Sequence, residues 1–192
     1  MTLHRRSIRL QHYDYSQAGA YFVTICAHAR ECLFGEIVDG AMILNDYGKI
    51  VEEEWLKSAE IRKELELDAY VIMPNHLHGI VLINNEGGLT VGASGRSPLT
   101  TDVRAHGRAP LRSDQPILHR KPRSLGSFIA GFKSATTKRL NISRNTPSFA
   151  VWQRNYYEHI IRDEIDLNRI REYVQHNPVR WAEDENNPKR VK

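Results

Sequence analysis

Apolar and polar positions along the chain predict several short strands. β-Branched and aromatic residues dominate Tyr21–Cys26, Leu67–Met73 and His76–Ile83, as is typical of strands. Two further apolar runs, Leu33–Val38 and Ala41–Leu44, flank the dipeptide Asp39-Gly40, which favours a tight two-residue hairpin. A last short strand is expected over Phe149–Trp152.

Helical spacing of apolar residues predicts three helices. The first runs from about Tyr47 to Ala59 after a capping Asn45, and the second from Leu125 to about Leu140 after a capping Ser124. The third starts at Asp163 or Asp166 and ends before Pro178. Hairpins with interspersed helices favour an α+β fold. We expect a ferredoxin-like antiparallel sheet of four to five strands with helices packed on one face.

Residues 84–123 differ from the rest of the chain. They are rich in glycine and proline and lack an apolar period, and seven Lys or Arg residues lie between Arg96 and Arg123 against Asp102 and Asp114. This composition predicts a basic, flexible loop inserted into a single domain that covers residues 1–192.

Charge and hydropathy narrow the class of partner. The net charge is +4 and the pI about 9.1, which favours an acidic partner, nucleic acid first, although an ordinary basic enzyme remains an alternative. No run of 18 apolar residues occurs and the first residues lack the apolar core of a signal peptide, so we expect a cytoplasmic, nucleoid-associated protein without membrane contact. Cys26 and Cys32 are expected to be packing residues.

Two pairs of residues suggest chemistry. His76 and His78 are two apart on an expected strand, and Tyr173 and Asn177 are four apart on an expected helix, so each pair shares one face. Two imidazoles and an amide oxygen can hold a divalent ion beside a tyrosine nucleophile. Alternatives remain open: His176 is a rival third ligand, Tyr156 and Tyr157 are rival nucleophiles interpreted as sheet-edge packing, and His159 stands alone.

Several sequence blocks, in order, resemble one family. The segment Tyr70–Gly79 resembles the HUH motif of single-tyrosine transposases, and the whole chain resembles their REP-associated subgroup, the RAYT proteins. The blocks that carry this resemblance cover nearly all of the chain outside residues 84–123: Arg5–Leu10, Gly19–Thr24, Leu33–Glu36, Leu44-Asn45, Leu125–Phe128, Gly131–Ser134, Trp152-Gln153 and Tyr173–Trp181.

The resemblance implies a metal-dependent nuclease and strand transferase that acts on single-stranded or hairpin DNA at palindromic REP-type elements. It implies His76, His78 and Asn177 as ligands of Mg²⁺ or Mn²⁺, and Tyr173 as the nucleophile that forms a covalent 5′-phosphotyrosine. Asn177 stands where related insertion-sequence transposases have a longer glutamine. A monomer and a homodimer are both compatible with this family.

Several basic and aromatic residues are candidates for contacts with DNA. Six of them are expected to contact DNA phosphates: Arg5, Arg6, Arg9, Lys133, Lys138 and Arg139. Tyr13, Tyr15 or Trp181 could stack bases. Two alternative functions remain, a domesticated DNA-hairpin-binding protein without turnover and a metal-dependent hydrolase of small molecules.

Overall fold

The computed structural model describes residues 13–84 and 121–190. In chain order its elements are β1 (Gly19–Cys26), η1 (His28–Arg30), β2 (Gly35–Val38), β3 (Ala41–Leu44), α1 (Asp46–Ile61), β4 (Leu65–Met73), β5 (His76–Ile83), α2 (Leu125–Ser143), β6 (Tyr157–Ile161), α3 (Glu164–His176) and η2 (Trp181–Glu183). Asn45, Ser124 and Asp163 cap the three α-helices, as the sequence predicts for the first two and as one of two alternatives for the third.

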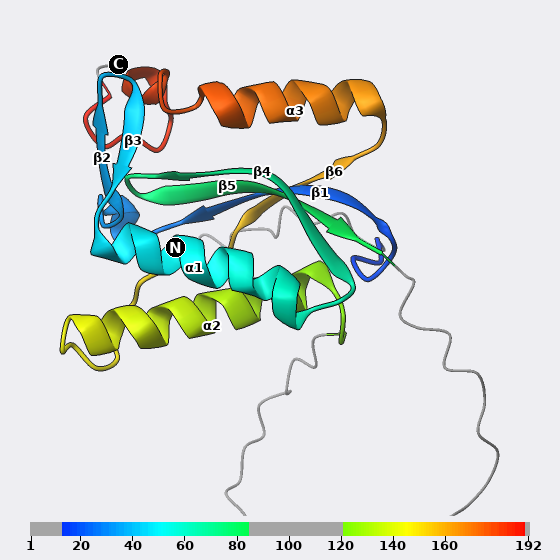
Figure 1. The fold of residues 1–192 in the computed structure, drawn as a ribbon, viewed down its shortest axis with the longest axis horizontal. Helices are drawn as coiled ribbons and strands as arrows, with labels where there is room; N and C mark the ends of the chain where they lie inside the picture. Colours follow the sequence, from blue (N-terminus) through cyan, green and yellow to red (C-terminus); the bar gives the residue numbers. More distant parts are fainter. Residues whose placement is uncertain (1–12, 85–120, 191–192) are drawn as a thin grey trace, which may run out of the picture.

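Four strands form the main sheet, in the order β4-β5-β1-β6, and every neighbouring pair is antiparallel. The central position of β5 and β1 between β4 and β6 is the strand order of a ferredoxin-like sheet. β2 and β3 pair only with each other and form a separate ribbon (Figure 1). The predicted α+β class and ferredoxin-like sheet are therefore confirmed.

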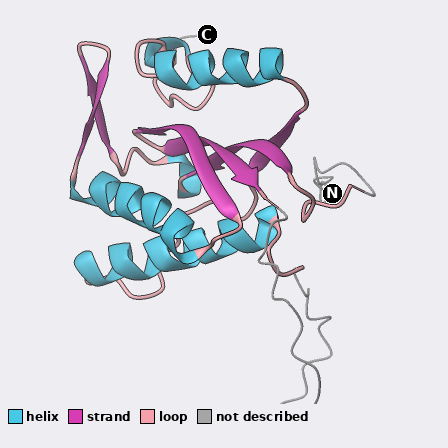
Figure 2. Ribbon diagram, turned by 45° about the vertical axis from the view of Figure 1, so that its right-hand side comes forward, coloured by secondary structure: helices cyan, strands magenta, loops and turns pink. Residues whose placement is uncertain are grey.

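Helices cover both faces of the sheet (Figures 1 and 2). α1 and α2 bury the main core, which includes Trp55 and Phe128, against one face. α3 lies on the other face over a smaller cluster that includes Phe22, Ile80 and Val174. The expectation of helices on one face was wrong, because strands β1 and β5 carry apolar side chains at both odd and even positions and so need cover on both sides.

Gly79 lets α1 approach the main sheet closely. A Cβ atom at this position would lie 2.4 Å from the ring of Trp55, far inside van der Waals contact. Trp55 is completely buried, so the glycine that follows His78 serves the packing of α1 on the face opposite the histidines.

The last strand differs from the prediction. Phe149–Trp152 forms no strand; Trp152 makes a single bridge to Ala27, and its indole Nε1 donates to the hydroxyl of Thr136 on α2 at 2.7 Å. Burial against α2 therefore explains the apolar residues there. The strand is β6, where polar Glu158 and His159 interrupt the apolar pattern.

The inserted segment was predicted over residues 84–123, of which 85–120 lie outside the described residues. Within the described ranges, no helix is long and apolar enough to cross a bilayer. Cys26 is partly buried, as expected of a packing residue, whereas Cys32 is exposed and the prediction for it was wrong.

Candidate functional site

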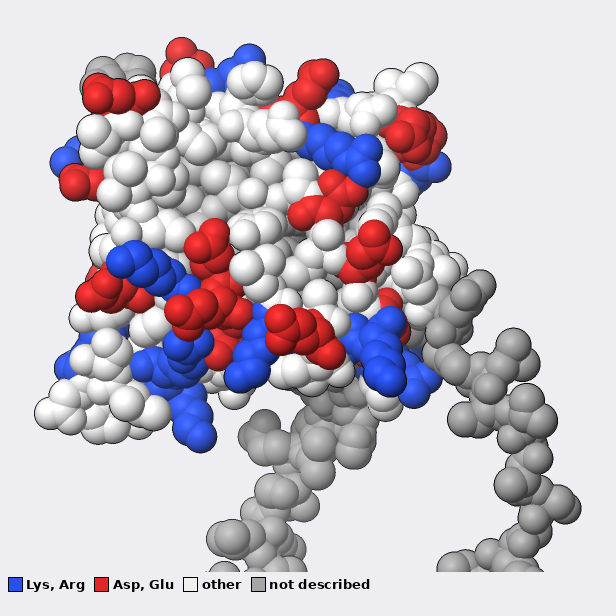
Figure 3. All heavy atoms as spheres, in the orientation of Figure 1, with Lys and Arg blue, Asp and Glu red and all other residues white. Residues whose placement is uncertain are grey.

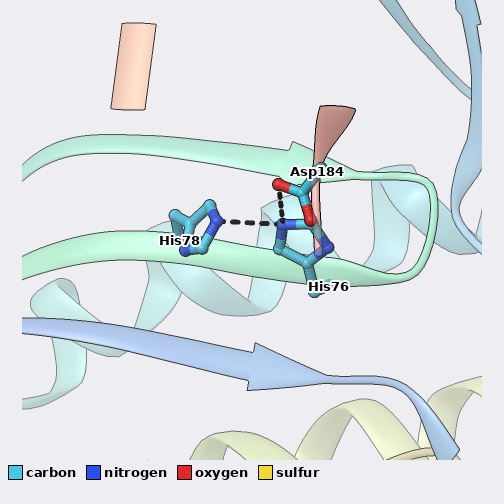
Figure 4. A group of neighbouring side chains, drawn as sticks. All are labelled: His76, His78 and Asp184. Atoms are coloured by element: carbon cyan, nitrogen blue, oxygen red, sulfur yellow. Dashed lines mark hydrogen bonds and ion pairs between the residues drawn. The ribbon is translucent and has the colours of Figure 1, made fainter. Parts of the chain in front are cut away.

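His76 and His78 lie at the start of β5 and point to the α3 face of the sheet, like Ile80 further along the strand. Both are buried, with exposed fractions of 0% and 2%. Their Nε2 atoms face each other at 2.9 Å (Figure 4). Nitrogen ligands at adjacent corners of an octahedral ion, each about 2.1 Å from it, lie about 3.0 Å apart, so this pair is spaced as two ligands of one ion.

Asp184 adjoins the histidine pair, and Asn177 lies beside Tyr173 at the end of α3. The carboxylate of Asp184 approaches His76, with Oδ2 3.9 Å from Nε2, and one ligand atom from each of these three residues lies within 4.8 Å of the others (Figure 4). Asn177 is 3% exposed, and its buried Oδ1 has no hydrogen-bond partner. A buried amide oxygen without a partner is costly unless a ligand satisfies it. These donors fit a hard divalent ion that accepts both imidazole and oxygen ligands.

Asn75 determines which nitrogen of His76 carries the proton. Its Nδ2 donates to two backbone carbonyls, of Arg30 at 2.9 Å and of Asn186 at 2.8 Å, which orients the amide. Its Oδ1 therefore faces His76 Nδ1 at 2.9 Å and can only accept. His76 thus carries its proton on Nδ1 and presents the lone pair of Nε2 to the site.

Thr24 plays the corresponding part for His78. The threonine on β1 lies directly opposite His78, and its hydroxyl is 2.9 Å from Nδ1. A hydroxyl can donate or accept. Without an ion, His78 donates from Nε2 to the lone pair on His76 while Thr24 donates to Nδ1. If an ion bound at Nε2, His78 would carry its proton on Nδ1 and donate it to Thr24 instead.

Both imidazoles are held in the neutral form that binds metal. Burial lowers the pKa of His76 to about 4, against a smaller opposing effect of Asp184. Burial, and then the neighbouring His76, lowers the pKa of His78 well below its ordinary value. Both histidines are therefore neutral at neutral pH, so protons do not compete with a cation for their nitrogen atoms.

Tyr173 reaches this centre from α3. Its Oη lies 3.3 Å from His78 Nε2 and the two rings are 5.2 Å apart, while 41% of the residue remains exposed. Burial raises the pKa of Tyr173, followed by the charge of Asp184, whereas a hydrogen bond from Asn177 lowers it. The phenol therefore keeps its proton at neutral pH until something at the site stabilises the anion.

Ion pairs fix the orientation of α3 on the sheet. The guanidinium of Arg171 contacts both carboxylate oxygens of Asp68 on β4. Near the start of the helix, His159 Nε2 lies 2.7 Å from Asp166 Oδ2. These contacts hold the face of α3 that carries Tyr173 towards the histidines, and they account for His159, which does not belong to the metal centre.

Comparisons with known proteins point to one family and one fold. The chain is 42% identical over 182 residues to an uncharacterized protein of Haemophilus influenzae, covering 95% of this chain and 92% of that protein. The chain belongs to the family of that protein. No family model matches.

Among solved structures, the chain matches a REP-associated tyrosine transposase bound to a REP hairpin, with a TM-score of 0.53 and 18% identity, over 90% of this chain and 74% of that one. This chain has the fold of that transposase, which confirms the predicted resemblance at the level of the fold. A candidate transposase of Deinococcus radiodurans is more distant, with a TM-score of 0.39 and 14% identity over 87% of this chain and 95% of that one.

The structure brings His76, His78, Tyr173 and Asn177 together. His176, the rival ligand, is exposed, and its Nδ1 lies 2.8 Å from the backbone oxygen of Glu172. His76, His78 and Tyr173 contact one another in turn, and Asn177 hydrogen-bonds Tyr173, although these residues come from the start of β5 and the end of α3; their roles stay predictions.

The two tyrosines that rival Tyr173 as nucleophile differ in their surroundings. Tyr156 is partly buried, packs against the main core and lies beneath the ammonium of Lys133. Tyr157, in contrast, is 45% exposed on the α3 face of the sheet. Interpretation as sheet-edge packing holds for the first tyrosine only.

The six predicted phosphate contacts differ in their surroundings. Arg5, Arg6 and Arg9 lie outside the described residues. The guanidinium of Arg139 contacts Glu53 and Glu54, at 2.6 and 2.9 Å. The face drawn in Figure 3 mixes acidic and basic side chains along α1 and shows no continuous basic surface there. Lys138 is exposed on α2.

Lys133 and the proposed stacking residues also have structural partners. The Lys133 ammonium donates to the carbonyls of Gln153 and Asn155, at 2.9 and 3.0 Å. Tyr13 and Tyr15 pack against each other and the main core. Trp181 remains close to the site, with its ring 6.0 Å from that of His76.

Three residues of the site were missed by sequence analysis. Asn75 adjoins the histidine pair, and a polar residue next to a ligand is a usable signal for an orienting role. Thr24 lies 54 positions from His78 and Asp184 lies 108 positions from His76. Only strand pairing, for Thr24, and the return of the chain after α3, for Asp184, place them at the site.

Proposed function

We propose that this protein is a metal-dependent single-strand DNA nuclease and strand transferase that acts at palindromic REP-type hairpins through a covalent 5′-phosphotyrosine. The observation that carries the proposal is the position of the Tyr173 oxygen, 3.3 Å from His78 Nε2 at the edge of a buried group of two imidazoles, a carboxylate and an unpartnered amide oxygen. A nucleophile beside a cation site is the arrangement that phosphoryl transfer to a side chain requires.

His76, His78, Asp184 and Asn177 are the residues that would hold the ion, which we propose to be Mg²⁺ or Mn²⁺. Imidazole ligands favour Mn²⁺ over Mg²⁺. When bound, the ion supplies charge neutralisation at the scissile phosphate. Asn75 and Thr24 would leave the Nε2 atoms of the two histidines available to it, because each contacts the other nitrogen of its histidine.

The reaction of Tyr173 is a transesterification. Its Oη forms a bond to phosphorus, the bond from phosphorus to the 3′ oxygen breaks, and the phenolic proton ends on the released 3′-OH. Asn177 supports the phenolate, since its hydrogen bond lowers the pKa of Tyr173. A phenol of pKa roughly 10 is a far better leaving group than an alcohol, so a 3′-OH can reverse the step and rejoin DNA.

A hairpin with an unpaired flank suits this site. Tyr173 on α3 remains 41% exposed beside the histidines, and the described part of the chain has no element suited to separating a duplex. An unpaired strand needs no such separation, and a stem beside it offers two rows of phosphates to basic side chains. The solved transposase of the same fold binds a REP hairpin, which supports the same substrate class for this chain.

Two alternative functions can be distinguished from this proposal by experiment. A DNA-hairpin-binding protein without turnover would need neither Tyr173 nor the ion. A small-molecule hydrolase draws support from Asp184, because two histidines and one carboxylate form a metal-binding set that also serves other chemistry. Neither alternative forms a covalent bond between protein and DNA.

The decisive experiment measures that bond. Wild type and Tyr173→Phe are incubated with Mn²⁺ and a labelled REP-type hairpin with its flank, a scrambled single strand or a perfect duplex, and adducts are separated on denaturing gels. Adduct is expected with wild type, most strongly on the hairpin, and none with Tyr173→Phe, whose DNA binding stays nearly unchanged. Tyr156→Phe is the matched control and should retain the adduct. Adduct formation by Tyr173→Phe, or preference for the duplex, would contradict the proposal.

A further inference from the structure

A row of three side chains crosses the sheet at the candidate site. Thr24 on β1 is paired with His78 on β5 and, on its other side, with Tyr157 on β6. Directly paired residues project to the same face of a sheet. Tyr157 therefore stands on the face that carries the histidines, two strands away from His78.

Tyr157 is exposed although it lies on a sheet face. It is one of three aromatic residues in the described ranges that are more than two-fifths exposed, with Phe149 and Tyr173. α3 packs against β4 and β5, so it covers the half of the sheet that is further from β6. The ring of Tyr157 is therefore left exposed to solvent on the same face of the sheet as Tyr173.

Phe22 joins the two exposed tyrosines. Its ring meets that of Tyr157 at 6.4 Å and that of Tyr173 at 5.9 Å, both in edge-to-face geometry. Phe22 is itself buried, so its ring contacts hold both tyrosine rings in place.

A basic groove lies on the α2 side of the sheet, next to the segment that precedes β6. The groove, of about 450 Å³, lies between α2 and the segment before β6, and its lining includes Lys133, Lys138 and Arg154 together with hydroxyls of Ser134 and Thr137. No acidic side chain lines it. Arg154, at the end of this lining, precedes Tyr157 by three residues, so a cationic side chain suited to a phosphate and an exposed ring suited to a base lie on the same short segment of chain.

We propose that Tyr157 is a base-stacking residue that holds the nucleotide next to the scissile phosphate. This inference rests on the proposed function. A single strand held in the groove on the α2 side would pass around the edge strand β6 to the ring of Tyr157, and its next phosphate would then reach Tyr173. The role requires the aromatic ring and not the hydroxyl, so Tyr157 is a binding residue and not a second nucleophile.

The first test measures binding without cleavage. Fluorescence anisotropy titrations use a labelled single strand of about twelve thymidines (dT12). They compare four proteins that all carry Tyr173→Phe: the parent without further change, and the parent with Tyr157→Phe, Tyr157→Ala or Phe149→Ala. Loss of one stacked base corresponds to about 5- to 150-fold weaker binding. We expect this loss for Tyr157→Ala alone, with Tyr157→Phe and the control Phe149→Ala close to the parent.

The second test locates the stacked base. A dT12 strand with 5-iododeoxyuridine at one position is irradiated on the parent protein, and the crosslinked peptide is identified by mass spectrometry. A crosslink at Tyr157 supports the proposal. Equal affinity of Tyr157→Ala and the parent would overturn it, as would equal losses in Tyr157→Phe and Tyr157→Ala. If the parent itself fails to bind the strand, the stacking role fails, whereas the proposed function stands or falls by the covalent adduct on the hairpin.

Discussion

Replacing Thr24 by valine isolates the support that one hydroxyl gives to the candidate metal site. Valine has nearly the shape of threonine, keeps the β-branch that suits β1, and removes only the partner of His78 Nδ1, 2.9 Å away in the buried site. His78 then has no group that holds its proton on Nδ1 when an ion occupies Nε2, and the ligand form of the ring loses its preference.

The magnitude follows from the single hydrogen bond that valine cannot make. Removing a group that orients a metal-bound histidine weakens metal affinity by about 10- to 100-fold, or roughly 1.4 to 2.7 kcal/mol. The unpaired Nδ1 costs about 1–3 kcal/mol of stability, partly offset by the buried methyl group. Valine at position 24 should therefore lower Mn²⁺ affinity by about tenfold or more in a protein that still folds.

Calorimetric titration of chelator-treated protein with Mn²⁺ checks the affinity, and Thr24→Ser, which restores the hydroxyl, is the matched control. Imidazole ¹⁵N shifts of the metal-free protein report the tautomers: His76 should carry its proton on Nδ1 and His78 on Nε2 in all variants, because the hydrogen bond between the two rings does not involve position 24. Unchanged Mn²⁺ affinity in Thr24→Val, or an equal loss in Thr24→Ser, would refute this account of the site.

Other predictions concern the ligands, pH and the basic surface. His76→Ala or His78→Ala should each abolish Mn²⁺ binding in the same titration, and Asn177→Ala should weaken it less, since water can replace an amide oxygen; unchanged affinity in both histidine variants would exclude the site. Burial lowers the pKa of His76 from 6.5 to about 4, so the metal-free folded protein binds fewer protons than the unfolded chain between these values. Its free energy of unfolding should fall as pH drops through this range, by up to roughly 1.4 kcal/mol per pH unit, and a flat profile in urea unfolding would contradict this. Lys138→Gln should reduce the salt dependence of hairpin binding by about one counterion, whereas Arg139→Gln, whose charge pairs with two glutamates, should leave it unchanged.

The sequence determined the local parts of the molecule. Capping residues located the starts of α1 and α2, the Asp39-Gly40 turn located the β2–β3 ribbon, and period two placed His76 and His78 on one face. Each of these features depends on residues only a few positions apart, because the backbone geometry of a few consecutive residues sets a helix cap, a turn or the face of a strand.

The tertiary structure decided everything that depends on distant residues. The row from His78 through Thr24 to Tyr157 exists because β1 pairs with both β5 and β6, and Asp184 reaches His76 only because the chain folds back after α3. Placement of α3 on the second face followed from apolar residues on both sides of β1 and β5. Such contacts are selected by burial and pairing across the whole sheet, and no spacing along the chain encodes them.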